Sequence, residues 1–320
     1  MTPEAAAPLP SKPIRHRVLS LDGGGAKGVY SLGFLSRLEA QLGSPLSNHF
    51  ELVFGTSTGS LIACLVSLGY SIAEIYDQYL DQVPSILSGF RAKRRSEKLQ
   101  VAIEALLKGK SYDDLKCYTG IVATNWEKKQ PLIFKNFAGM AHSGAKTFVP
   151  GHGVPLSEAL QASCSAYPLF KPVPVRLVNQ GGVLVHAYDG GFCANNPSAF
   201  ALLDAKQLGW DLSHVTLFSV GVGHYPKPKR RTITRLGMAF VSLSPSVRLS
   251  QAVLEISSNT STITQQLFDK SLNAFRADET FDLPELGTDL LETNIEKLRS
   301  LYSQGTQTFQ KNEKLIVSLL

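Results

Sequence analysis

The side chain with the clearest chemical potential in this chain is the hydroxyl of Ser57, in the segment FELVFGTSTGSLIACLVSLG (residues 50–69). An apolar run ends at Gly55, and a helical pattern of small residues follows Gly59. We therefore predict a strand that turns sharply into a helix at Ser57. A serine at such a nucleophile elbow has a strained backbone that pushes its hydroxyl out of the sheet, and the flanking glycines let strand and helix approach each other. The elbow residues around the serine are Gly55, Thr56, Thr58 and Gly59.

The G-x-S-x-G pattern alone is weak evidence for catalysis, because glycine and serine are common residues. The alternative is an ordinary tight turn in which Ser57 or Thr58 caps the following helix. In the catalytic interpretation, the N-terminus of that helix places partly positive N–H groups where an oxyanion would form. The case for chemistry therefore depends on what the rest of the chain brings to Ser57.

A glycine-rich loop is the second candidate element. The spacing predicts a strand from Arg17 to Asp22 and a helix from Val29 that ends at Gly43. The loop could cradle a pyrophosphate in a G-x-G-x-x-G pattern, form an oxyanion hole from bare backbone N–H groups, or be a plain turn. We favour the oxyanion hole, because loop and elbow both follow neighbouring predicted strands and because the acid that would bind a ribose is missing from the end of the second strand. The loop residues are Gly23, Gly24, Gly25, Ala26, Lys27 and Gly28.

Asp189 is the candidate base for Ser57. The alternation in GVLVHAY (182–188) predicts a strand that delivers Asp189 at its end, followed by Gly190 and Gly191. Asp-Gly-Gly is also a common turn signature. An exposed carboxylate is too weak a base for a serine hydroxyl, so the catalytic interpretation requires burial or a tight hydrogen bond. We expect Asn195 and Asn196 to cap a helix over 198–208 and to hold the aspartate loop in place.

Taken together, these motifs resemble those of the patatin-like phospholipases of bacterial type. The resemblance rests on DGGGAKG (22–28), GTSTG (55–59), DGG (189–191) and Asn195-Asn196-Pro197, and it extends from about residue 17 to about residue 225. It implies a lipid acyl hydrolase with a Ser-Asp dyad, in which Ser57 is the nucleophile, Asp189 the base and the glycine-rich loop the oxyanion hole. It also implies that the segment 166–170 lines the acyl site, whereas core packing of Tyr167 and Phe170 is the alternative.

The closest rival mechanism is a Ser57-Asp189-His224 triad, since α/β-hydrolases place their triad in the chain order Ser, Asp, His. His224 follows a predicted strand over 215–220 and a Gly-Val-Gly break. That break fits the patatin-like pattern, and we favour the dyad. Two alternatives come from other classes of protein: a nucleotide-binding regulatory protein that uses the glycine-rich loop, and a catalytically silent scaffold of the same fold.

Composition sets limits on the class of protein. The chain has 320 residues, 43% of them hydrophobic, and a formal net charge of +6, so it can bury a substantial core. The cysteines lack the short paired spacings of metal sites, and we expect reduced thiols, no metal and no cofactor. A calcium-dependent lipase would need a set of oxygen ligands that the sequence does not offer. The four cysteines are Cys64, Cys117, Cys164 and Cys193.

We predict a single three-layer α/β/α domain with a mainly parallel central sheet over 17–320, after a disordered lead-in over 1–16. The lead-in lacks the apolar region of a secretory signal, and the uncharged stretch 52–73 holds too many small polar residues to cross a membrane. The C-terminal part, about 236–320, reads as helical and would cover the sheet or form a dimer face. Further predicted helices cover 71–87, 156–165, 236–275, 288–301 and 306–320, and predicted strands cover 117–124 and 131–134.

Two basic clusters, at 91–98 and 227–231, are candidates for contact with anionic lipid headgroups, although most charge runs are solvated faces. We expect a phospholipid membrane surface as the substrate and a cytoplasmic location with peripheral contact with the inner membrane. Some bacterial members of the family are activated by cyclic oligonucleotides in antiphage defence, which the clusters permit without selecting it. No nucleic acid polymer is expected as a partner, and a homo-oligomer stays open.

Overall fold

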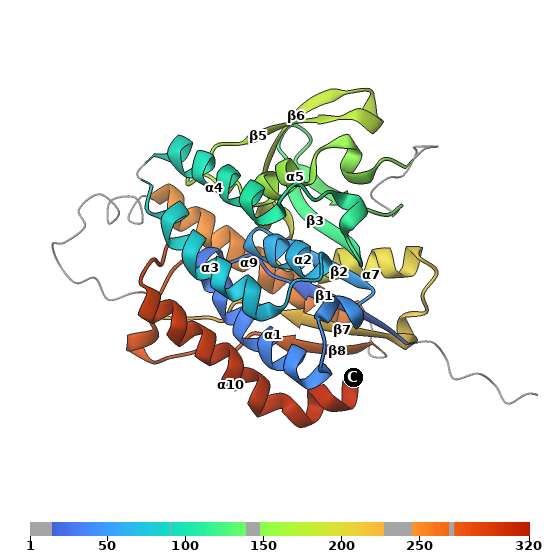
Figure 1. The fold of residues 1–320 in the computed structure, drawn as a ribbon, viewed down its shortest axis with the longest axis vertical. Coiled ribbons are helices and arrows are strands. Elements are labelled where there is room, and N and C mark those ends of the chain that lie inside the picture. The colour runs from blue at the N-terminus through green and yellow to red at the C-terminus, as the bar shows by residue number, and fades with distance from the viewer. Residues whose placement is uncertain (1–14, 90, 139–147, 227–244, 269–271) are drawn as a thin grey trace, which may run out of the picture.

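The computed structural model describes residues 15–89, 91–138, 148–226, 245–268 and 272–320. Eight strands in this part of the chain form one sheet in the order β5-β6-β3-β2-β1-β7-β8, with β4 paired to β3 (Figure 1). The pairs that involve β1, β2 or β7 are parallel, whereas β3–β4, β3–β6 and β5–β6 are antiparallel. The mainly parallel sheet is therefore confirmed. The strands are β1 (His16–Leu21), β2 (Leu52–Thr56), β3 (Tyr118–Asn125), β4 (Gln130–Lys135), β5 (Val173–Leu177), β6 (Val183–Asp189), β7 (Val215–Val220) and β8 (Asn273–Ala277).

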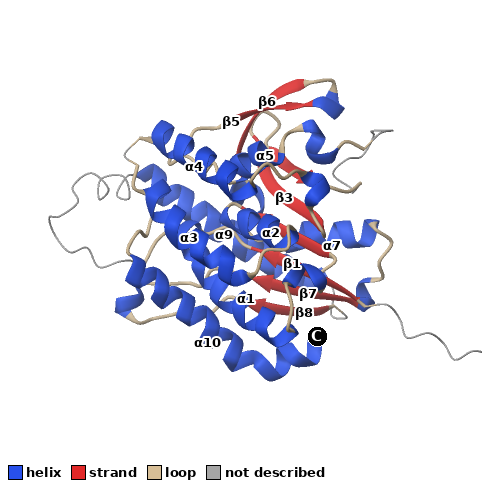
Figure 2. Cartoon of the chain, viewed as in Figure 1, coloured by secondary structure: helices blue, strands red, loops and turns tan. Residues whose placement is uncertain are grey.

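Helices cover both faces of the sheet (Figure 2). Side chains alternate along the central strands, so that Leu19 and Leu21 of β1 belong to one buried cluster and Val18 to another. The first cluster contains apolar residues of α1, α2, α3 and α10, and the second contains residues of α6 and α7. The sheet is thus the middle layer of three, as predicted. The α-helices are α1 (Gly28–Leu42), α2 (Thr58–Ser67), α3 (Ile72–Leu87), α4 (Ala92–Leu107), α5 (Leu156–Ser163), α6 (Gly191–Ala194), α7 (Ser198–Gln207), α9 (Pro245–Phe268) and α10 (Ile295–Leu319).

The C-terminal helices differ from the sequence prediction. Instead of two helices over 288–301 and 306–320, a single helix α10 begins after the N-cap Asn294 and packs along α1. Gly305 lies inside this helix opposite Gly33 of α1, and a Cβ atom at either position would collide with the backbone of the other helix. Glycine at position 305 therefore allows α1 and α10 to approach each other closely, and it does not end α10.

The prediction of a helix over 236–275 is wrong at the C-terminal end of this range. Residues 236–244 lie outside the described part of the chain, α9 ends at Phe268, and residues 273–277 form β8 beside β7. Phe275 packs against Phe34 and Phe218, so pairing with β7 and burial of this ring determine the conformation of the segment. Because both partners are distant in sequence, local periodicity did not reveal the strand.

Other boundaries shift less. The first strand begins at His16 rather than Arg17, whereas residues 1–14 of the predicted lead-in lie outside the described residues.

The basic run at 91–98 forms the first turns of α4, a helix that we did not predict, and its Arg95 points inward to donate to the carbonyl of Leu169. The second basic cluster, at 227–231, lies outside the described residues. Strand β5 was also missed.

Candidate active site

Ser57 forms the sharp turn between β2 and α2. Its backbone has φ 53° and ψ −128°, a conformation that L-residues rarely adopt. A Cβ atom at Gly55 would collide with the backbone of Gly59, and one at Gly59 would collide with the backbone that ends β1. The elbow thus requires glycine at both positions, because β2, α2 and β1 come together there. This is the predicted strand-turn-helix arrangement around Ser57.

Asp189 lies within hydrogen-bonding reach of Ser57. The Ser57 hydroxyl donates to Asp189 Oδ2 at 2.7 Å, and the N–H of Gly191 donates to Asp189 Oδ1 at 2.7 Å. The side chain is 1% exposed, and this burial raises the pKa of the carboxyl from 3.8 to about 7, although both hydrogen bonds act in the opposite direction. The structure therefore gives the aspartate the two properties that a base for serine requires.

The aspartate reaches this position from an antiparallel strand. β6 runs against β3, with Asp189 opposite Ala123, and the next residue, Gly190, lies so close to the backbone of Val122 that no side chain would fit. The carbonyl of Asp189 also accepts from Thr124 Oγ1 at 2.8 Å. The turn after β6 is therefore packed directly onto β3.

The end of α5 supports both catalytic candidates, and sequence reasoning missed it. Ser163 Oγ accepts from the N–H of Ser57 at 2.9 Å and donates to the carbonyl of Val122 at 2.6 Å, while the carbonyl of Ser165 accepts from the N–H of Asp189. Ser163 thus links Ser57 to the sheet. A serine at the end of a predicted helix is too ordinary a signal to have found it.

Most backbone N–H groups of the glycine loop already donate hydrogen bonds. Those of Gly23, Ala26, Lys27 and Gly28 donate to backbone carbonyls. The N–H of Gly24 makes only a long contact of 3.3 Å with Thr58 Oγ1, and that of Gly25 has no acceptor among the described residues. Gly24 and Gly25 line the same cavity as Ser57, so these two N–H groups are the candidates for an oxyanion hole within the predicted loop 23–28.

An apolar cavity of about 70 Å³ lies over Ser57 and Asp189. Ala166, Leu169 and Phe170 line it, as the family resemblance implied, whereas Tyr167 is 53% exposed and does not. The apolar lining of this cavity suits part of an acyl chain. Its other apolar walls are Leu61, Val83, Ile86, Leu87, Leu99, Cys164, Leu254 and Leu290.

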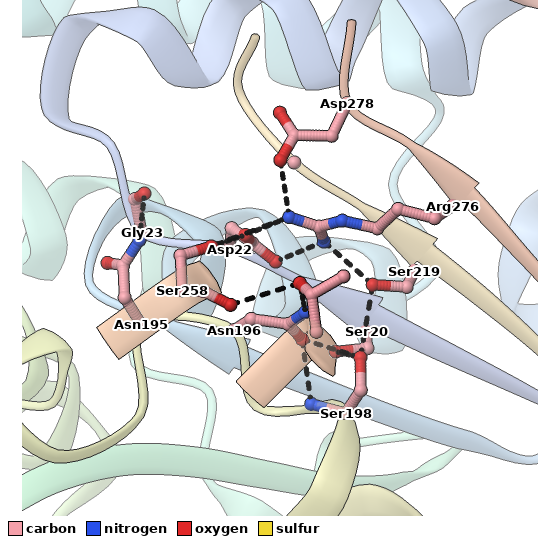
Figure 3. Close-up of polar contacts among 12 residues, drawn as sticks. Ser20, Asp22, Gly23, Asn195, Asn196, Ser198, Ser219, Ser258, Arg276 and Asp278 are labelled. Carbon is pink, nitrogen blue, oxygen red and sulfur yellow. Dashed lines mark hydrogen bonds and ion pairs between the residues drawn. The ribbon is translucent and has the colours of Figure 1, made fainter. Parts of the chain in front are cut away.

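A buried ion-pair network lies directly behind the glycine loop (Figure 3). Arg276 of β8 binds the carboxylate of Asp22, the last residue before the loop, at 2.8 and 2.6 Å, and also donates to Asp278 at 2.6 Å. Ser258 of α9 donates to Asp22 at 2.8 Å. Burial alone would raise the pKa of the Asp278 carboxyl, but Arg276 holds it well below its ordinary value. The sequence patterns did not indicate this network.

The two asparagines of the aspartate loop have different roles. Asn196 Oδ1 accepts from the N–H of Ser198 at 3.0 Å and so supports the start of α7, as expected. Asn195 instead binds the glycine loop: its Nδ2 donates to the carbonyl of Gly23, and its own carbonyl accepts from the N–H of Gly23, both at 3.1 Å (Figure 3). Asn195 therefore joins the aspartate loop to the glycine loop.

His224 contacts neither Ser57 nor Asp189, and its Nε2 lies 3.4 Å from Asp278. The other described histidines also have partners elsewhere: His16 stacks on Trp210, and the rest contact Ser44, Asn179, Glu127 and Asp211. The contact of Ser57 Oγ is with the carboxylate directly. This geometry supports the dyad over the triad.

Two features are absent from the described residues. No group of three or more histidine, cysteine, aspartate or glutamate side chains within them could hold a metal ion. None of the helices in the part of the chain that the structure describes is both long and apolar enough to cross a membrane.

Comparison with known proteins gives one consistent result. Residues 19–202 match the family model described as patatin-like phospholipase. The chain is 42% identical over 298 residues to a cUMP-AMP-activated phospholipase of Escherichia coli. The alignment covers 93% of this chain and 91% of that protein. It is 28% identical over 202 residues to a cGAMP-activated phospholipase of Pseudomonas aeruginosa, covering 60% and 57% of the two chains. Among solved structures, VipD from Legionella pneumophila aligns with a TM-score of 0.46 and 14% identity over 94% of this chain and 68% of that one.

Proposed function

The chain belongs to the patatin-like phospholipase family, and on this premise we propose that it hydrolyses fatty acyl esters of membrane phospholipids through Ser57 and Asp189. The observation that carries the proposal is the 2.7 Å hydrogen bond from Ser57 Oγ to a buried carboxylate whose pKa lies near 7. The apolar cavity beside this pair supports an acyl ester as the substrate.

In the first half of the reaction, Ser57 Oγ attacks the ester carbonyl carbon while its proton moves to Asp189 Oδ2. The carbonyl oxygen becomes an oxyanion that the N–H groups of Gly24 and Gly25 stabilise. The bond to the glycerol oxygen then breaks, and the proton on Asp189 goes to that leaving oxygen. The products are a lysophospholipid and an acyl ester on Ser57.

In the second half, Asp189 takes a proton from a water molecule that attacks the acyl-enzyme. The new tetrahedral oxyanion uses the same N–H groups, and its collapse breaks the bond to Ser57 Oγ. The proton on Asp189 returns to this oxygen as the fatty acid leaves. One carboxylate thus serves as base and acid in turn, which its pKa near the working pH favours.

We further propose that a cyclic dinucleotide activates the enzyme in antiphage defence, since two relatives are named for activation by cUMP-AMP and cGAMP. The membrane would be reached from the cytoplasm by peripheral contact. The exposed residues Arg91, Lys93 and Arg94 support this contact, because they precede Leu99 of the same helix, which lines the catalytic cavity. Each cation near an anionic surface contributes about 1 kcal/mol.

The deciding experiment measures free fatty acid from phospholipid vesicles with the wild type, Ser57→Ala and Asp189→Ala, with and without cUMP-AMP. We expect release only from the wild type, and we expect a fluorophosphonate probe to label the wild type at Ser57. Release that persists in Ser57→Ala would exclude this mechanism. Absence of both labelling and release would instead favour a catalytically silent scaffold, and nucleotide binding without any release would favour a regulatory protein.

A further inference from the structure

The catalytic cavity is too small for the substrate of the proposed reaction. Its volume of about 70 Å³ is well below the roughly 300 Å³ at which ligand pockets begin. A long acyl chain therefore requires its walls to move apart. Two of these walls, Leu254 of α9 and Leu290, come from the C-terminal part of the chain rather than from the sheet that carries Ser57.

A second cavity, of about 720 Å³, lies on the other side of these walls. Leu254, Leu290, Gly24 and Asn195 line both cavities. The second cavity has the size of a ligand pocket, and many of its lining residues are charged or polar. Its other lining residues are Asp22, Gly23, Lys27, Val222, Gly223, His224, Tyr225, Gln251, Ala252, Glu255, Ser258, Asp278, Thr288 and Asp289.

The charges around the second cavity are compatible with the binding of an anionic ligand. Asp22 and Asp278 share the single guanidinium of Arg276, and burial raises the pKa of the Asp22 carboxyl, which favours its neutral form. Burial raises the pKa of the Asp289 carboxyl, which favours its neutral form. The remaining carboxylate, Glu255, is at an exposed position on α9.

The cationic and hydrogen-bonding groups that remain match a nucleotide. Lys27 and the imidazole of His224 face this cavity and can donate to phosphate oxygens; burial lowers the pKa of Lys27, whereas the hydrogen bond with Asp278 raises that of His224. Gln251 and Glu255 offer an amide and a carboxylate of the kind that pair with the polar edges of bases. Phosphate-binding cations and base-reading groups thus occur together in one cavity.

Helix α9 connects this cavity to the glycine loop and to the aspartate loop. Ser258 donates to Asp22 at the start of the glycine loop (Figure 3), Ser257 Oγ accepts from the N–H of Asn195, and the end of the Leu254 side chain packs on Gly191. A ligand that packs against Gln251 and Glu255 therefore acts on the same helix that closes the apolar cavity. Any shift of α9 moves Leu254.

We propose that the second cavity is the binding site for the cyclic dinucleotide activator, and that its occupation moves α9 and Leu254 so that the apolar cavity accepts a long acyl chain. This inference rests on the proposed function. It predicts that activation depends on the length of the acyl chain, because a short ester needs less space beside Ser57 than a long acyl chain does.

The binding test uses isothermal titration of cUMP-AMP and of cGAMP into protein that carries Ser57→Ala, so that no turnover occurs. Adding Ala252→Trp should fill the cavity and weaken binding at least about tenfold. Ile256→Trp is the matched control, because Ile256 lies on the same helix, is 62% exposed and lines neither cavity. His224→Ala should also weaken binding, and circular dichroism melts identify any variant that fails to fold.

The activation test compares 4-nitrophenyl butyrate with vesicles of dioleoyl phosphatidylglycerol. We expect the nucleotide to raise long-chain hydrolysis by at least about tenfold more than short-chain hydrolysis, and Leu254→Ala to raise long-chain hydrolysis without nucleotide. The proposal is overturned if neither nucleotide binds, if folded Ala252→Trp and His224→Ala variants bind like Ile256→Trp, or if both substrates are activated equally. Failure of the proposed function is a different result, namely no Ser57-dependent hydrolysis of either substrate under any condition.

Discussion

Replacing Asp189 with asparagine should remove activity and stabilise the protein at the same time. Burial raises the pKa of this carboxyl from 3.8 to about 7 in the folded protein, whereas the unfolded chain restores the ordinary value. The folded state therefore binds more protons between these two values, so the contribution of Asp189 to stability is greatest below pH 4 and falls as the pH rises through 7. At pH 8 the buried charge costs about 4 kcal/mol, at about 1.4 kcal/mol per pKa unit.

The asparagine variant is close in shape and carries no charge at any pH. We therefore expect Asp189→Asn to raise the free energy of unfolding by up to about 4 kcal/mol at pH 8 and to leave it nearly unchanged at pH 4. Urea denaturation at a series of pH values measures both. Asp113→Asn is the control, because Asp113 is exposed and its replacement should change stability by less than about 0.5 kcal/mol at either pH.

The same pKa governs the rate. If Asp189 must be ionised to accept the proton of Ser57, kcat/KM of the wild type falls about tenfold for each pH unit below 7 and is about a hundredfold lower at pH 5 than its plateau. Activity that is independent of pH from 5 to 8, together with an Asp189→Asn variant that is no more stable at pH 8 than the wild type, would refute the reasoning.

Three further predictions follow from the loop, the network and the basic cluster. Gly25→Ala should lower kcat at least about hundredfold while phospholipid still binds. The reason is that Gly25 has φ 55° and that its N–H is a candidate oxyanion donor. Turnover measures the loss of kcat, and vesicle binding measures whether phospholipid still binds. Arg276→Met should cost about 3–5 kcal/mol in urea denaturation by leaving the buried carboxylate of Asp22 without a cationic partner, whereas Lys311→Met, which breaks a more exposed ion pair, should cost less than about 1 kcal/mol. Replacing Arg91, Lys93 and Arg94 together with glutamine should weaken binding to anionic vesicles and leave binding to neutral vesicles unchanged; equal loss on both would contradict membrane attraction by charge.

The parts of the site that sequence reasoning predicted are those with a local signature. An elbow that needs glycine at positions 55 and 59, and a turn that needs glycine at 190, leave a pattern in consecutive residues, because only glycine fits where backbones touch. The strands that lead to Ser57 and Asp189 are short apolar or alternating runs, which predicted both their type and their ends. The layered fold followed from the same patterns.

The sequence alone could not show contacts between distant segments. Arg276 binds Asp22, which lies 254 residues earlier in the chain, and nothing near residue 276 indicates such a partner. The same holds for Ser163, whose two contacts are with β3 and the elbow. A strand such as β8 is stabilised by pairing with β7, so its conformation depends on tertiary structure that local propensity does not contain.

A carboxylate can replace a histidine as the base only where the protein changes its acidity, and the fold explains how this happens. β6 runs antiparallel to β3 and brings Asp189 into a buried position between β3, the end of α5 and the start of α6. Burial there raises the pKa of the carboxyl, while the hydrogen bonds from Ser57 and Gly191 keep it from rising further. If Asp189 were moved toward solvent, for example by a shift of α9 that carried Gly191 with it, its pKa would fall and the base would weaken. The movement of α9 that opens the acyl cavity must therefore leave the aspartate loop in place, so we expect activation to raise the rate for long-chain esters without shifting the pH at which the activity is half its maximum.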